Sequence, residues 1–260
     1  MSLLRVENLT MRFGGLLAVD KVCFTAQPQA ITSIIGPNGA GKTTLFNCLT
    51  GFYRPTSGHI FLEHHQTSFA LETMARAAIP RQARVARTFQ NIRLFAGMTV
   101  LENLLVASNA RHSYFFTDFI HTSGAKHRLE QAIQKALSWL DFFGLRHTAN
   151  TTAGSLSYGQ QRKIEIARAL CTDPVLLCLD EPAAGLNAAE SAELMHRLAA
   201  LPRERGIALL LIEHDMGMVM GISDHIVVLE YGRKIAEGNP AHIRHHPEVI
   251  RAYLGEGNEE

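Results

Sequence analysis

The chain has 260 residues and a formal net charge of +1, which is enough length for one large domain or two closely joined ones. This near-neutral charge argues against a dedicated nucleic-acid-binding protein, which usually carries a marked basic excess, although residues 76–87 form a local basic segment. The longest apolar stretches, such as residues 207–212, are far shorter than the roughly 20 residues of a membrane-spanning helix, and the N-terminus does not resemble a signal peptide.

The four cysteines are spread along the chain without C-x-x-C spacing; they are Cys23, Cys48, Cys171 and Cys178. This spacing argues against a zinc site or a disulfide framework. We expect most of them to be buried as small apolar residues in a reducing cytoplasm.

Apolar and polar residues alternate over residues 4–30 around Gly14 and Gly15, which predicts antiparallel strands joined by a turn. Phe13 stands just before this turn. A phenylalanine there is ordinarily a core residue, but an exposed aromatic ring at that place could stack on a nucleotide base.

A phosphate-binding motif follows an apolar strand predicted over residues 31–35 and precedes a helix predicted over residues 42–49. Glycines let the backbone turn its N–H groups inward, where the helix N-terminus adds partial positive charge for phosphate oxygens. The lysine can reach the β- and γ-phosphates, and the first threonine offers a hydroxyl to magnesium. The motif comprises Gly36, Pro37, Asn38, Gly39, Ala40, Gly41, Lys42, Thr43 and Thr44.

The middle of the chain is predicted to be mainly helical. A turn at residues 55–58 leads into a strand at residues 59–62, and residues 67–84 read as a helix and loop. Thr99 and Glu102 form a capping-box pattern at the start of a helical block that runs to residue 145, with a loop at residues 113–124. This block interrupts an α/β core that resumes near Arg162, so we expect two lobes.

Two further apolar strands end in residues suited to phosphate chemistry. Residues 175–179 are continuously apolar, as in a central parallel strand, and Asp180 and Glu181 follow at the carboxyl end, where open α/β sheets bind ligands. Asp180 is suited to the magnesium shell and Glu181 to activating water as a general base. Residues 207–212 form a parallel strand that brings His214 to the same edge, where we expect it to sense the γ-phosphate. Hydrolysis of a nucleotide is therefore the predicted activity.

Between these motifs, residues 156–160 read LSYGQ and are followed by a helical pattern over residues 161–170. The segment resembles the LSGGQ signature of ATP-binding-cassette ATPases, and the ordered set of motifs covers nearly the whole chain. The resemblance implies an α/β fold with a P-loop NTPase (RecA-like) core, an N-terminal antiparallel β subdomain and an inserted helical subdomain. It places residues 1–90 and 160–255 in the nucleotide-binding core lobe, residues 91–159 in the helical signature lobe and residues 256–260 in a tail.

The resemblance also assigns roles to single residues. Phe13 matches the aromatic residue that stacks on adenine, and Gln90 matches the glutamine that joins the magnesium shell, beside Thr43 and Asp180. Glu181 matches the catalytic glutamate, and His214 matches the switch histidine. The implied ligands are ATP and Mg²⁺.

The signature implies a head-to-tail pair of cassettes. In the family it closes over ATP bound to the opposite subunit, so two ATP molecules lie at the interface of the pair and hydrolysis lets the pair separate. The residues concerned here are Ser157, Tyr158, Gly159 and Gln160. Tyr158 replaces the first signature glycine, and Asn187 replaces an aspartate often found in the loop that crosses the interface. Neither change touches the hydrolytic residues, so we expect full hydrolytic competence.

Several longer sequence segments resemble the ATP-binding subunit of high-affinity branched-chain amino acid importers. The segments that carry this likeness are residues 11–19, 46–53, 87–95, 180–187 and 249–255. Membership implies two membrane permease subunits, an extracytoplasmic solute-binding protein and a second, non-identical cassette, with homodimerisation as another possibility. The protein would then sit peripherally on the cytoplasmic face of the inner membrane, with no role for nucleic acid.

Other functions share part of this pattern. Cassettes that import urea or amides share much of this sequence, and a lipopolysaccharide-exporting cassette shares the short C-terminal helix. A soluble cassette outside transport would usually carry two cassettes or a long coiled-coil insert, and a P-loop kinase would leave LSYGQ and His214 without a role. A purely structural ATP-binding scaffold would leave Glu181 idle.

Overall fold

The computed structural model describes residues 2–110 and 123–254, and contacts between Cα atoms divide the chain into two compact units. We call residues 1–87, 175–181 and 198–260 the sheet unit, and residues 88–174 and 182–197 the helical unit. The lobe boundary placed at residue 159 stays a prediction.

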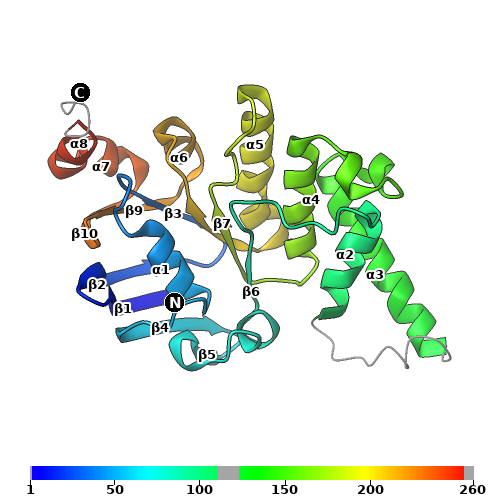
Figure 1. The fold of residues 1–260 in the computed structure, drawn as a ribbon, viewed down its shortest axis with the longest axis horizontal. Helices are drawn as coiled ribbons and strands as arrows, with labels where there is room; N and C mark the ends of the chain where they lie inside the picture. The colour runs from blue at the N-terminus through cyan, green and yellow to red at the C-terminus, as the bar shows by residue number, and fades with distance from the viewer. Residues whose placement is uncertain (1, 111–122, 255–260) are drawn as a thin grey trace. The chain divides into compact units, whose positions relative to one another are not determined.

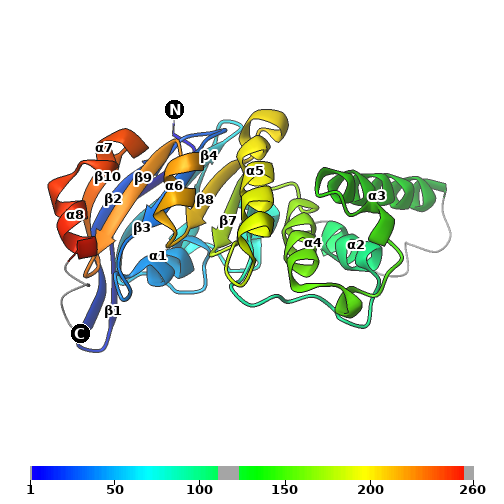
Figure 2. The same ribbon diagram turned by 90° about the horizontal axis from the view of Figure 1, so that it is seen from above.

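The strands of the sheet unit form an antiparallel sheet in the order β2-β1-β4-β5 and a mainly parallel sheet in the order β10-β9-β3-β8-β7-β6 (Figures 1 and 2). Strand β10 joins the second sheet antiparallel to β9, whereas β9, β3, β8, β7 and β6 pair in parallel. Their bounds are β1 Leu4–Phe13, β2 Leu16–Ala26, β3 Ile31–Ile35, β4 Ser57–His64, β5 Thr67–Ala70, β6 Val85–Arg87, β7 Leu176–Asp180, β8 Ala208–Ile212, β9 His225–Glu230 and β10 Arg233–Gly238.

Helices of the sheet unit lie along the sheets, whereas α2, α3 and α4 pack on one another in the helical unit (Figure 1). The sheet unit has α1 Lys42–Leu49, α6 Met216–Ile222, α7 Pro240–Arg244 and α8 Pro247–Leu254. The helical unit has α2 Val100–Ala110, α3 Ser123–Phe142 and α4 Tyr158–Leu170, and α5 Ala188–Arg205 contributes to both units. Short turns of 3-10 or π helix cover Leu71–Thr73, Ile79–Ala83, Arg146–Thr148 and Ala153–Ser155.

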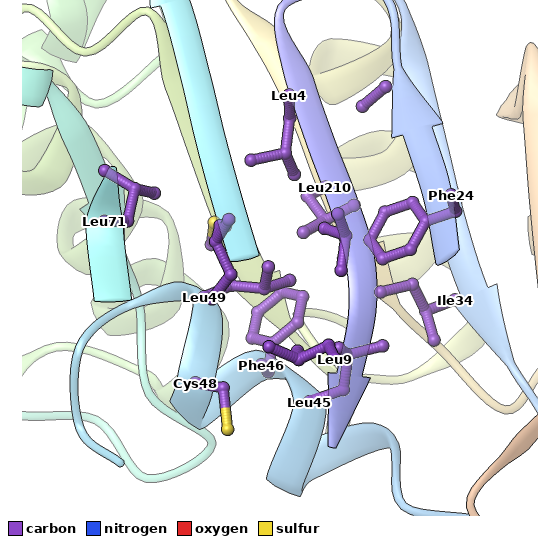
Figure 3. Close-up of a cluster of buried hydrophobic side chains, with 14 of the residues drawn as sticks. Leu4, Leu9, Phe24, Ile34, Leu45, Phe46, Cys48, Leu49, Leu71 and Leu210 are labelled. Atoms are coloured by element: carbon purple, nitrogen blue, oxygen red, sulfur yellow. The ribbon is translucent and has the colours of Figure 1, made fainter. Parts of the chain in front are cut away.

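Helix α1 is held between the two sheets by a buried apolar cluster, part of which Figure 3 shows. Leu45, Phe46 and Leu49 are completely or almost completely buried, and they share this cluster with Leu9 of β1 and Ile34 of β3. Each such side chain contributes about 1.5–3 kcal/mol by leaving water. The cluster therefore fixes the helix that begins directly after the phosphate motif.

The opposite face of the parallel sheet has its own apolar cover. Ile35 lies one residue beyond Ile34, so its side chain points to the other face, where it packs in a cluster with Val219 of α6 and Val228 of β9. Because both faces are covered, β3, β7 and β8 are buried along their whole length. This explains why the continuous apolar runs in the sequence predicted central parallel strands correctly.

Most of the predicted elements are confirmed, including the N-terminal antiparallel strands. The helix and loop expected over residues 67–84 is wrong for residues 67–70, which form β5 and pair with β4. The turn before β5 uses His65 and Gln66 at φ 48 and 61 degrees, the left-handed region that hairpin turns require. Without glycine or asparagine, this turn gave no signal in the sequence.

The capping box predicted at Thr99 is present. The Glu102 backbone N–H donates to Thr99 Oγ1 at 3.2 Å, and Glu102 Oε2 accepts from the Thr99 backbone N–H at 2.7 Å. The predicted loop at residues 113–124 lies outside the described residues, apart from residues 123 and 124, which belong to α3.

Three of the four cysteines are buried, as expected: Cys48, Cys171 and Cys178. Burial raises the pKa of each of these thiols to about 12, because an apolar environment disfavours the thiolate. Cys23 is half-buried. In the part of the chain that the structure describes, none of the helices combines the length and the apolar character needed to cross a membrane.

Candidate functional site

The phosphate motif forms a tight loop between β3 and α1 in the sheet unit. Gly36 has φ 148 degrees, and a Cβ there would lie 2.0 Å from the carbonyl oxygen of Leu229. Gly41 has φ 94 degrees, and a Cβ there would lie 2.4 Å from the carbonyl oxygen of Ala18. Neither position has room for a side chain, so neighbouring strands press the loop into its turn.

The loop presents positive charge at the start of α1. Gly41 is the N-cap of α1 and offers no side-chain hydrogen bond, so the first N–H groups of the helix suit an anion. The Lys42 Nζ donates to the carbonyl oxygens of Gly36 at 2.6 Å and Pro37 at 2.8 Å, which holds the ammonium over the loop. Hydrogen-bond donors and positive charge are thus brought together at the start of α1.

An open cavity of about 520 Å³ lies beside this loop, within the size range of small-molecule sites. It brings together the phosphate loop, the start of β2, the turn between β9 and β10 and the residue after β7. The lining residues are Leu16, Leu17, Ala18, Asn38, Gly39, Ala40, Gly41, Lys42, Thr43, Thr44, Glu181, Tyr231 and Gly232.

Glu181 enters the cavity because the chain turns sharply after β7. Its φ is 47 degrees, a left-handed conformation that is uncommon for a residue with a side chain, and its backbone N–H donates to the Ile212 carbonyl at 3.0 Å. Such a conformation costs on the order of 1–3 kcal/mol and is concentrated at functional sites. Here it places a carboxylate in the same cavity as Lys42 and Thr43.

Asp180 is buried at the end of β7 and accepts a hydrogen bond from Arg87 at 2.9 Å. Arg87 also donates to Asn47 Oδ1 at 2.6 Å and to Thr50 Oγ1 at 2.9 Å, both on or next to α1. The guanidinium therefore joins β6, β7 and α1 and keeps the Asp180 carboxylate oriented.

His214 and Phe13 lie outside the lining of this cavity. The His214 side chain follows β8 and is 66% exposed, with its Nδ1 3.8 Å from Glu213 Oε2. Phe13 ends β1, is 42% exposed and meets the Tyr53 ring edge-on at a centroid distance of 5.3 Å. The role of Phe13 at the base and that of His214 at the γ-phosphate stay predictions.

The helical unit holds Gln90 and the signature residues, and each is described within that unit. Gln90 is exposed on the segment after Thr88. Ser157 caps α4, with its Oγ accepting from the Gln160 N–H at 3.3 Å and its own N–H donating to Gln160 Oε1 at 3.2 Å. This capping box uses the hydroxyl as an acceptor, and the hydroxyl hydrogen is a donor suited to an anion.

The two departures from the usual family pattern have local explanations. Tyr158 is 45% exposed and lies against Gly185, where a Cβ would be 3.0 Å from Tyr158 Cε1. Asn187 Oδ1 accepts from the Glu190 N–H at 2.9 Å at the start of α5. An asparagine performs this capping as an aspartate does, so only a charge differs.

Close packing explains the glycine at position 159. A Cβ at this position would lie 2.7 Å from Glu190 Oε1, because the carboxylate of α5 packs directly on the start of α4. A larger residue would therefore displace the Glu190 carboxylate.

Sequence reasoning missed the cavity-lining residues Leu16, Leu17, Ala18 and Tyr231, and also the arginine behind Asp180. Parallel pairing of β6 with β7, which sets Arg87 opposite Cys178, explains the arginine contact. The sequence gave no clear signal for that pairing, because β6 has three residues.

Comparisons with known proteins agree with this geometry. A family model described as ABC transporter matches residues 19–184, and one described as branched-chain amino acid ATP-binding cassette transporter matches residues 233–259. The high-affinity branched-chain amino acid transport ATP-binding protein LivG of Escherichia coli K12 is 51% identical over 98% of both chains. The corresponding protein BraF of Pseudomonas aeruginosa is 50% identical, also over 98% of both chains.

Solved structures give the same picture of the fold. The ADP conformation of MJ1267, an ATP-binding cassette of an ABC transporter, superposes with a TM-score of 0.82 at 32% identity. The match covers 98% of this chain and 99% of that one. The expected fold class is thereby confirmed.

The glycines of the loop allow a matched test of its packing. Gly39 and Gly41 both have positive φ, but a Cβ meets nothing within 4 Å at Gly39 and the Ala18 carbonyl at Gly41. We expect Gly39→Ala to cost about 1 kcal/mol from backbone strain alone. Gly41→Ala should cost roughly 2–4 kcal/mol, because β2 must also move. Thermal unfolding without nucleotide measures both, and equal losses would contradict the packing described.

Proposed function

This chain belongs to the ATP-binding cassette transporter family, in the branched-chain amino acid group, and we propose that it hydrolyses ATP to drive import of branched-chain amino acids. The observation that carries the hydrolytic part is the shared cavity, in which Glu181 lies with Lys42 and Thr43. The matches to LivG and BraF support the cargo, since both proteins are named for branched-chain amino acid transport and align with nearly the whole chain.

The phosphate loop would bind the β- and γ-phosphates. Backbone N–H groups at the start of α1 and the Lys42 ammonium supply donors and positive charge on the cavity side of the loop. The same donors stabilise negative charge that develops on the phosphoryl oxygens as the terminal bond breaks. Leu16, Leu17 and Tyr231 provide an apolar rim for the rest of the nucleotide.

Glu181 would act as the general base. Its carboxylate takes a proton from water as the water oxygen bonds to the γ-phosphorus, and the bond from that phosphorus to the ADP oxygen breaks. The products are ADP and inorganic phosphate. The turn at Glu181 supports this role, because the backbone hydrogen bond to Ile212 fixes the base at the sheet edge.

The donor set also fits Mg²⁺, which prefers oxygen ligands. The Thr43 hydroxyl lines the cavity, and Asp180 offers a carboxylate at the end of β7. Bound there, the ion would neutralise charge on the phosphate oxygens during transfer. Arg87 would keep the Asp180 carboxylate oriented, as the contact at 2.9 Å indicates.

A second cassette would complete each site. The capped start of α4, with the Ser157 hydroxyl and the first N–H groups of the helix, suits the phosphates of an ATP held by another subunit. We propose a head-to-tail pair, either with a non-identical cassette or with a second copy of this chain. Separation of the pair after hydrolysis would drive the transport step.

Membrane partners follow from the importer role. Two permease subunits would hold the pair on the cytoplasmic face of the membrane, and an extracytoplasmic binding protein would deliver the amino acid. Phe95 and Met98 of the helical unit are exposed apolar side chains and support permease docking. We place the docking surface on residues 91–100.

Replacing the base tests hydrolysis directly. We expect Glu181→Gln to lower ATP turnover by roughly 100- to 10,000-fold, because the amide cannot accept the proton of the attacking water. ATP binding should persist, since the phosphate loop is unchanged. Phosphate release and equilibrium binding of labelled ATP measure the two effects. Glu230→Gln, in a residue that ends β9 outside the cavity lining, serves as the control. Unchanged turnover in Glu181→Gln would disprove the assignment of the base.

Changes in the docking segment test the permease contact. In vesicles that contain the whole transporter, we expect Leu94→Ala or Phe95→Ala to reduce leucine uptake while ATP binding and basal hydrolysis are kept. The reason is that both residues lie away from the phosphate loop in sequence and belong to the helical unit. Ile250→Ala removes an exposed apolar side chain of the sheet unit as a control. If transport and basal hydrolysis fall together while the complex stays assembled, the docking assignment is wrong.

A further inference from the structure

Arg162 of α4 is completely buried in the helical unit, which is unusual for a guanidinium. Its Nη1 donates to the Phe89 carbonyl at 2.5 Å and to Glu165 Oε2 at 2.9 Å, and its Nε donates to the Pro182 carbonyl at 3.1 Å. The planar group therefore joins two backbone segments that are far apart in the sequence. Each segment adjoins a residue of the proposed machinery: Phe89 precedes Gln90, and Pro182 follows Glu181.

Glu165 extends this connection by one more backbone contact. Its Oε1 accepts from the Arg93 N–H at 3.1 Å, while its Oε2 accepts from Arg162. Burial raises the pKa of the Glu165 carboxyl, and the nearby charge of Arg162 opposes this rise. The carboxylate and the guanidinium thus depend on each other in a site that excludes water.

The far end of the same segment is held by another buried polar side chain. Asn103 of α2 has no exposed surface; its Oδ1 accepts from the Phe95 N–H at 2.8 Å, and its Nδ2 donates to the Phe95 carbonyl at 3.1 Å. Residues 89–95 are therefore fixed to α4 at one end and to α2 at the other. A rigid segment of this kind transmits displacement better than a loop with few contacts.

We infer that the Arg162–Glu165 pair is a positioning link that carries movement of the docking segment to the backbone beside the catalytic base. This inference rests on the proposed function, because it takes Phe95 as part of the permease contact and Glu181 as the base. Displacement of residues 89–95 moves the Phe89 carbonyl, and the shared guanidinium passes that movement to the Pro182 carbonyl. Arg162 and Glu165 are positioning residues and do not touch the reacting atoms themselves.

The chemistry of the pair explains why a merely apolar contact would not serve. Two hydrogen bonds from one rigid guanidinium hold the Phe89 and Pro182 carbonyls in a defined geometry, whereas apolar side chains can slide past each other. The adjacent ion pair of Lys163 with Glu193 lacks this geometry, because Glu193 is 44% exposed and its partners are side chains. That pair provides a control on the same helix.

The test uses the complete transporter in vesicles, with the solute-binding protein and leucine present. We expect Glu165→Gln and Arg162→Lys each to lower the stimulated kcat for ATP by roughly 10- to 100-fold. A small misplacement of catalytic groups lowers the reaction rate by about this factor. The KM for ATP should stay within about twofold, because the phosphate loop is untouched. Glu193→Gln should leave both parameters as in the wild type.

A double-mutant cycle separates positioning from simple structural support. If the pair carries the signal from the docking segment, the double variant with Phe95→Ala and Glu165→Gln will have a leucine-stimulated kcat no lower than that of the more impaired single variant. Thermal unfolding of each variant shows that it is folded, and Arg162→Lys replaces Glu165→Gln in the cycle if the latter does not fold. Wild-type kcat in either single variant of the pair, or losses that multiply in the double variant, would overturn the inference. A wild-type complex that hydrolyses no ATP in response to leucine would instead refute the proposed function.

Discussion

Close backbone contact around the phosphate loop is the constraint on which the rest of the site depends. The Leu229 carbonyl presses on Gly36 and the Ala18 carbonyl presses on Gly41, so strands from both sheets fix the loop. A further hydrogen bond from the Gly232 N–H to the Ala40 carbonyl, at 3.1 Å, ties the loop to the turn between β9 and β10. Behind the loop, the buried face of α1 keeps the helix from tilting. Donors for phosphate are thus set in place by packing before any ligand arrives, which reduces the cost of ordering them on binding.

The hydrolytic groups use the same sheet in a different way. Parallel pairing of β7 with β8 sets Asp180 opposite Ile212, and the Ile212 carbonyl then holds the next N–H, that of Glu181. Asp180 is buried and paired with Arg87, whereas the strained backbone of the next residue, Glu181, brings the Glu181 side chain to the cavity. Two adjacent carboxylates therefore meet different surroundings, in line with the separate roles proposed for them.

Much of this could be predicted from the sequence, and the rest could not for identifiable reasons. Continuous apolar runs revealed β7 and β8, because strands covered on both faces tolerate few polar residues. Strand β5 was missed, since its turn uses His65 and Gln66 in left-handed conformations that are unusual for these residue types. The contacts of Arg87 and Arg162 join segments distant in sequence, and only the folded chain shows which carboxylates and carbonyls they meet. Of the predicted site, Lys42, Thr43 and Glu181 share one cavity, whereas Phe13 and His214 lie outside its lining.

Fold, family and cargo therefore rest on different kinds of support. Packing and hydrogen bonds explain how the sheet unit brings the phosphate loop and Glu181 to one cavity. The most direct test of the whole account is uptake of labelled leucine by cells that lack this chain, with either the wild-type or the Glu181→Gln protein restored. The account predicts that uptake is lost without the chain and returns only with the wild-type protein. Leucine uptake that stays intact without the chain would contradict the proposed cargo, and rescue by Glu181→Gln would contradict the role of hydrolysis.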